Sequence, residues 1–264
     1  MVPRFFTMLC IQLIFIVRDN LASRLAAGAV TSLTYGWMIQ QVPETLIGTA
    51  IGTALLPTLS EHFSKDEKSA FSETIQKAVK VLMALTLPIA VILAVGLQPL
   101  LGMAFDFGTD GTRLLSWVTA AFLAGLFGHS LKEVSARSFY ARQNALIPLM
   151  TAALNIGLYI LVGSLLYRPL GAPGIALTDS LVFTFEAVLL IVLLNRKMLP
   201  AIKLDSTWVR ALLAAATAGL VTWGSTTLLD GKVHPLLSAS LPMAIGLAAA
   251  IPWIMRELKI LLKL

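Results

Sequence analysis

Long apolar stretches separated by short polar connections run along most of the chain. A helix needs about 20 consecutive, mostly apolar residues to cross about 30 Å of bilayer hydrocarbon. The pattern therefore predicts an all-α polytopic membrane protein with about eight transmembrane helices. The predicted spans are approximately residues 6–27, 36–57, 79–101, 114–135, 145–167, 173–194, 208–229 and 236–255.

The segment 35–61 is apolar enough to cross a bilayer, yet it carries polar residues and a proline. Pro43 lacks a backbone donor and disfavours helical geometry at the preceding residue, so we expect a kink there. Lipid cannot satisfy the freed backbone groups. We therefore predict that Gln40, Gln41 and Glu44 face the bundle interior, as part of a substrate pathway.

Gly48 and Gly52 follow this proline and stand four residues apart. Small residues at this spacing allow a second helix to approach closely. An ordinary packed helix with a glycine pair explains the same pattern, so the segment alone does not decide between a pathway and packing.

The composition supports a membrane protein. Hydrophobic residues make up 57% of the 264 residues and charged residues 13%, with a mean hydropathy of +0.84. Soluble domains carry about 25% charged residues. The net charge of +6 comes from basic residues scattered over short connections, which is typical of topology signals and does not indicate a nucleic-acid partner. Cys10 is the only cysteine, so no internal disulfide is possible.

The basic residues also predict the orientation of the chain. Fifteen of the 20 lysine and arginine residues fall on one side of the predicted membrane, and five fall on the other. Basic residues are enriched in cytoplasmic connections. We therefore expect both termini to be cytoplasmic.

Residues 60–80 connect the second and third predicted spans. Phe63, Phe71, Ile75 and Val79 recur at spacings near three or four, between acids and lysines. This pattern predicts an amphipathic helix that lies on the membrane interface.

Several polar residues interrupt the predicted spans. Arg18 and Arg24 fall in the first span, Asn155 in the fifth, and Asp179 and Glu186 in the sixth. An ionised group costs about 2.5–3.5 kcal/mol at the centre of a membrane helix unless it is paired or hydrated. Arg18, Arg24, Asn155 and Glu186 are therefore candidates for a substrate pathway. Alternatively, the two arginines lie near the outer surface and extend to the headgroups.

The sequence contains no HExxH, P-loop, GxSxG or CxxC motif. His62, His129 and His234 fall in three different segments, which disfavours a metal cluster. We expect neither an enzyme nor a bound metal or cofactor.

Four stretches occur in an order that resembles a known family: LASRLAAGAVTSLTYGW before the proline-broken helix, LLPTLSE after it, then SFYARQNALIP and GAPGIALTDS. They resemble the C-terminal half of the MurJ/MviN lipid II flippases, which belong to the MOP (MATE-like) exporter superfamily. The stretches cover most of the chain up to about Lys197.

The resemblance implies a protein of two six-helix lobes and two terminal helices that flips an undecaprenyl-pyrophosphate-linked peptidoglycan precursor across the bacterial inner membrane. Residues 1–197 then correspond to the second lobe, and residues 198–264 to the terminal pair. The first lobe is missing, and a truncated gene start at Met1 is one interpretation. Besides the polyprenyl-linked substrate and membrane lipids, the implied partner is an N-terminal lobe or a second copy of this chain.

The sequence departs from the family at one place. The family's eighth helix usually carries an arginine, and an acid three positions later, just before the proline. Met38 and Gln41 occupy these positions here, and Arg18, Arg24 and Glu44 are the candidates to substitute for them. The alternatives are a non-transporting membrane scaffold, a decayed fragment, or an exporter of another polyprenyl-linked glycan.

Overall fold

A computed structural model describes residues 2–198, 206–229 and 232–261. Within these ranges the regular elements are all helical. In chain order they are α1 (Val2–Ala22), α2 (Ala29–Glu44), the π-helical turn η1 (Thr45–Thr49), α3 (Ala50–Ser64), α4 (Lys68–Gly96), α5 (Gln98–Phe105), α6 (Gly108–Leu123), α7 (Leu126–Ala141), α8 (Leu146–Met198), α9 (Thr207–Leu229) and α10 (Pro235–Leu261). Lys203 and Lys263, two of the fifteen basic residues predicted to be cytoplasmic, lie outside the described residues.

The longest element, α8, is two antiparallel helices joined by a sharp turn. Its 53 residues would extend about 80 Å as one straight helix, far more than the hydrocarbon thickness. At Gly171 the backbone takes φ 63° and ψ −143°, which glycine adopts more readily than other residues. Residues 146–170 and 172–198 therefore form the fifth and sixth spans.

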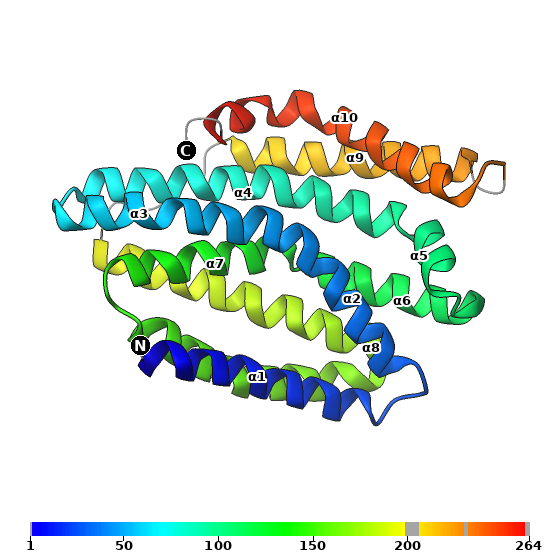
Figure 1. The fold of residues 1–264 in the computed structure, drawn as a ribbon, viewed down its shortest axis with the longest axis horizontal. Coiled ribbons are helices and arrows are strands. Elements are labelled where there is room, and N and C mark those ends of the chain that lie inside the picture. Colours follow the sequence, from blue (N-terminus) through cyan, green and yellow to red (C-terminus); the bar gives the residue numbers. More distant parts are fainter. Residues whose placement is uncertain (1, 199–205, 230–231, 262–264) are drawn as a thin grey trace.

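The other spans follow the predicted order (Figure 1). Six described helices, with α2, η1 and α3 taken as one, are long and apolar enough to cross a membrane, and α6 with α7, bent by 40°, makes a seventh. The turn inside α8 raises the count to eight. Figure 1 shows α1 beginning and α10 ending at the same end of the molecule, as an even number of spans requires. The predicted all-α polytopic fold is confirmed.

The first span is shorter than predicted. It ends at Ala22, and the connection to α2 closes at Gly28, whose φ is 90°. Arg24 consequently lies in this connection and not inside a helix.

The predicted interfacial helix over residues 60–80 is wrong. α3 continues to Ser64, Asp66 makes a tight turn at φ 55°, and α4 begins at Lys68. Phe71 and Ile75 are buried in the core between helices. The period of three to four therefore reflects packing within the bundle, not contact with lipid headgroups. In the turn, Lys65 donates a hydrogen bond to the Glu61 carboxylate at 2.6 Å, which raises the pKa of the Lys65 ammonium.

Close packing of α7 against η1 and α3 explains the two glycines after Pro43. A Cβ atom at Gly48 would stand 2.7 Å from the Cα of Ser130, and one at Gly52 would stand 2.8 Å from Cδ of Arg137. The predicted close approach of a second helix is confirmed, and that helix is α7.

The terminal helices α9 and α10 pack on each other and on α4. Their shared core is made largely of small residues, including Ala84, Ala214, Ala218 and Ala250. The division at residue 197 into a six-helix lobe and a terminal pair stays a prediction.

Candidate functional site

The site is built around the break in the second span. Pro43 is the second-last residue of α2, and the π-helical turn η1 begins two residues after it. Prolines and π turns are the usual causes of sharp helix bends. Figure 1 shows that the chain changes direction between α2 and α3.

The polar side chains before this break do not all face the same way. Gln40 is fully buried, and its Nε2 donates a hydrogen bond to Oε2 of Glu44 at 3.1 Å. Gln41 is exposed, because it lies about 100° around the helix from Gln40. The prediction of an inward-facing side chain is therefore wrong for Gln41, while Gln40 points inward as predicted.

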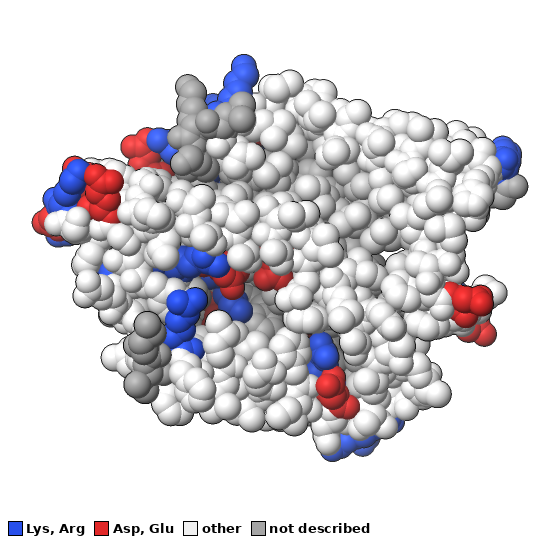
Figure 2. All heavy atoms as spheres, viewed as in Figure 1, with Lys and Arg blue, Asp and Glu red and all other residues white. Residues whose placement is uncertain are grey.

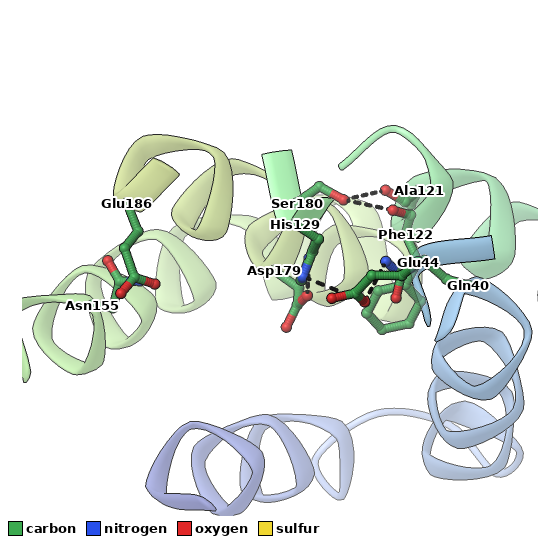
Figure 3. A network of polar contacts seen from close by, with 9 residues as sticks. All are labelled: Gln40, Glu44, Ala121, Phe122, His129, Asn155, Asp179, Ser180 and Glu186. Carbon is green, nitrogen blue, oxygen red and sulfur yellow. Dashed lines mark hydrogen bonds and ion pairs between the residues drawn. The ribbon is translucent and has the colours of Figure 1, made fainter. Parts of the chain in front are cut away.

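Glu44 reaches a histidine on α7. Nε2 of His129 lies 3.0 Å from Oδ2 of Asp179 on α8, and its Nδ1 lies 4.0 Å from Oε2 of Glu44. Figure 3 shows His129 between the two carboxylates. This contact was not predicted, because His129 stands apart from the other histidines in the sequence.

Ser180, which follows Asp179 on α8, stabilises the bend between α6 and α7. Its hydroxyl donates to the carbonyl oxygens of Ala121 and Phe122, at 2.6 and 3.2 Å (Figure 3). The two carbonyls lie next to the bend, where the helical hydrogen-bond ladder is interrupted. In a membrane such groups need a protein partner.

Asn155 and Glu186 are brought together by the turn inside α8. Nδ2 of Asn155 donates to Oε2 of Glu186 at 2.6 Å, and the Thr151 hydroxyl donates to Oε1 at 3.2 Å. All three side chains are buried. The two candidate residues therefore form one hydrogen-bonded unit between the fifth and sixth spans.

Glu186 also borders a charged cleft of about 180 Å³ between α1, α3, α7 and α8. Arg4, Lys132 and Arg137 supply positive charge there, and Glu133 supplies a second acid. Figure 2 shows a hollow in this face with basic and acidic groups gathered around it. Arg4, Lys132 and Arg137 are among the fifteen basic residues predicted to lie on the cytoplasmic side, so they were interpreted only as topology signals. Their convergence from two helices far apart in the sequence is not visible in the sequence.

Arg137 and Lys132 are held in this cleft by different contacts. Nη2 of Arg137 lies 3.3 Å from the Glu133 carboxylate, and its Nη1 donates to the Thr53 hydroxyl at 2.5 Å. The Lys132 ammonium lies 4.4 Å from the centre of the Phe183 ring. Guanidinium and ammonium groups in a cleft can bind the oxygens of a phosphate.

Arg18 and Arg24 do not reach this cleft. Arg18 is buried, pairs with Asp19 at 3.0 Å and lies over the Phe15 ring. It is 14 residues from Arg4 along the same helix, or about 21 Å. Arg24 is exposed and donates to the side chain of Asn20 at 2.8 Å. Their predicted part in a substrate pathway remains a prediction.

The sequence profile of the family described as "Lipid II flippase MurJ" matches residues 1–243. The chain belongs to the MurJ family. It is 29% identical over 230 residues to "Lipid II flippase MurJ" of Burkholderia cenocepacia, covering 85% of this chain and 44% of that protein. It is 30% identical over 238 residues to "Probable lipid II flippase MurJ" of Haemophilus influenzae, covering 84% and 46%. The chain thus spans somewhat less than half the length of these MurJ relatives.

Solved structures show the same fold. A MurJ in an inward closed conformation superposes with a TM-score of 0.76 at 20% identity, covering 96% of this chain and 52% of that one. A MATE P26A mutant gives a TM-score of 0.64 at 12% identity, covering 98% and 64%. The resemblance to the MurJ family and the MATE-like fold inferred from the sequence motifs are both confirmed.

Proposed function

We propose that this chain acts as the C-terminal portion of a lipid II flippase, and that the cleft between α1, α7 and α8 binds the pyrophosphate of the lipid-linked precursor. The observation that carries the proposal is the convergence of Arg4, Lys132 and Arg137 on one cleft in a chain of the MurJ family. Such a chain is a transporter component and not an enzyme, and its substrate is a polyprenyl-pyrophosphate-linked glycan.

The composition of the cleft fits a diphosphate. Three cations face two acids, and Glu186 already accepts hydrogen bonds from Thr151 and Asn155. An incoming diphosphate would supply oxygens to the donors of Arg137 and Lys132, which lie about 1.4 turns apart on α7. The usual arginine position of the family holds Met38, whose side chain is 52% exposed. The cations of this half therefore come from α1 and α7, and not from α2.

Transport requires a second bundle. Alternating access moves one bundle against another around a central site. We propose that an N-terminal lobe, or a second copy of this chain, supplies the opposing surface. The protein then resides in the bacterial inner membrane with both termini in the cytoplasm, in accordance with its basic residues.

Binding of undecaprenyl pyrophosphate to the chain in lipid nanodiscs tests the cleft directly. A hydrogen bond to a charged group contributes about 1.5–3 kcal/mol, so Lys132→Gln and Arg137→Gln should each weaken binding about 10-fold or more. Arg168→Gln is the matched control, because Arg168 is exposed and contacts Tyr167 on α8. Equal affinity of all three variants and the unchanged chain would exclude the cleft as the pyrophosphate site.

A further inference from the structure

Three ionisable side chains meet outside the charged cleft, where α2, α7 and α8 pack together. His129 is 5% exposed and Asp179 is 1% exposed, and the Glu44 side chain is largely buried. The imidazole lies between the two carboxylates, 3.0 Å from one and 4.0 Å from the other (Figure 3). The proposed binding of pyrophosphate makes no use of this cluster.

The number of available protons decides how the cluster is bonded. A neutral imidazole donates from one ring nitrogen only, whereas a protonated imidazole donates from both. With neutral His129, only one of Asp179 and Glu44 can accept a hydrogen bond from the ring. Protonated His129 can serve both carboxylates at once.

The surrounding charges also favour an additional proton. Burial opposes a charge on the His129 ring, and the charged groups that act on the ring are Glu44 from α2, Asp179 from α8 and Lys132 from its own helix. Lys132 is itself shared with Glu186, which lines the cleft. Without a proton on His129, one lysine therefore faces three buried carboxylates in a low-dielectric interior, and buried charges that are not balanced are costly.

We propose that His129, Asp179 and Glu44 form a buried proton-binding site, and that its proton holds the break in the second span against α7 and α8. The ligand is a single exchangeable proton. Both contacts of His129 lie within ion-pair distance, and the hydrogen bond of the cluster runs from Gln40 to Glu44. Among the described residues, no group of three or more histidine, cysteine, aspartate or glutamate side chains is placed to hold a metal ion.

The position of Glu44 gives the proton a mechanical effect. Glu44 is the last residue of α2, and η1 begins at the next residue. Gly48 of η1 lies against Ser130, the neighbour of His129 on α7. When the proton leaves, Glu44 loses its ion pair with the ring and faces Asp179 as a like charge. The contact between η1 and α7 should then loosen, and η1 should move relative to α8.

Titration of the imidazole tests the site on the chain alone. In a His62→Gln, His234→Gln background, His129 is the sole histidine and its ring nitrogens can be followed by NMR in nanodiscs between pH 5 and 9. Removal of a neighbouring negative charge moves a titration by about one pH unit or more. We expect Asp179→Asn and Glu44→Gln each to move the midpoint to lower pH by that amount, while Asp110→Asn, at the start of α6, leaves it unchanged.

A second measurement follows the break itself. Spin labels at Leu46 and Leu181, both well exposed, report the distance between η1 and α8 in a Cys10→Ser background. We expect this distance to change with pH at the midpoint of the His129 titration, and to be independent of pH in His129→Gln. The proposal is overturned if His129 does not titrate, if neither carboxylate variant moves its midpoint, or if the pH-dependent distance change persists in His129→Gln. Neither measurement uses pyrophosphate, so the outcome is independent of the proposed flippase function.

Discussion

Two pairs of buried polar side chains join residues that are far apart in the sequence. Asn155 and Glu186 are 31 positions apart, and Arg210 on α9 pairs with Glu257 on α10 across 47 positions. The sequence marked Asn155 and Glu186 as exceptions within apolar spans, because polar residues are costly there. It could not pair them, since the pairing depends on the turn at Gly171. The contacts of His129 could not be predicted either, since they depend on the packing of α7 against α2 and α8.

Replacement of Asn155 by alanine should destabilise the protein. It leaves one oxygen of the buried Glu186 carboxylate without its donor, and an unsatisfied buried group costs about 1–3 kcal/mol. Thermal unfolding in detergent measures the loss. Asn20→Ala is the control, because its hydrogen bond to Arg24 is exposed and should contribute less than about 0.5 kcal/mol. Equal stability of the two variants would contradict the buried pairing.

The ion pair between Arg210 and Glu257 should respond asymmetrically to mutation. The Glu257 side chain is 2% exposed and that of Arg210 is 25% exposed. Arg210→Ala leaves a buried carboxylate with Thr207 as its remaining partner, which should cost about 3 kcal/mol or more, whereas Glu257→Ala leaves an arginine that can extend to water. Comparison of the two unfolding temperatures tests this order, and a more stable Arg210→Ala variant would refute it.

For the helices, the sequence predicted which ones form better than it predicted where each begins and ends. The apolar runs located the spans, and Pro43 and the glycine pair indicated the break and the close packing. The segment 60–80 was misassigned because apolar residues at a period of three to four look alike on a membrane interface and in a helix core. Phe71 and Ile75 are buried by α3, α7 and α8, which the local pattern does not contain.

Gly48→Ala should disturb the packing of η1 on α7. The added Cβ would meet backbone and side-chain atoms of Ser130 at 2.7–2.8 Å, and overpacking of this kind costs about 1–3 kcal/mol. Gly157 in α8 is a matched control, since a Cβ there meets no atom within 4 Å and alanine is the better helix former. The unfolding temperature of Gly157→Ala should therefore equal or exceed that of the unchanged chain, and the unfolding temperature of Gly48→Ala should be lower.

At the scale of the whole molecule, hydropathy and charge predicted eight spans with both ends on one side, whereas the cleft could not be predicted. Arg4 comes from α1, Lys132 and Arg137 from α7, and Glu186 from α8. Nothing local in the sequence indicates that these residues meet. Basic residues at these positions are explained equally well by the topology of the chain and by a binding cleft. Only the packing of α1 and α7 against α8 distinguishes these two interpretations.

The orientation can be measured with single cysteines in a Cys10→Ser background. Lys68 begins α4 at the end where α1 starts, and Arg113 lies near the start of α6 at the opposite end. An impermeant thiol reagent should label Arg113→Cys in intact cells, and Lys68→Cys only after the membrane is opened. Labelling of Lys68→Cys from outside would show that the topology is the reverse of the predicted one.

The most direct measurement of the central claim is exposure of lipid II on the outer face of the inner membrane in cells depleted of their own MurJ. The chain is co-expressed with the N-terminal half of the Haemophilus influenzae relative. We expect restored exposure with the unchanged chain and with Arg168→Gln, and loss of exposure with the Lys132→Gln, Arg137→Gln double variant at equal abundance in the membrane. Normal exposure with that double variant would exclude the cleft as the substrate site of the flippase.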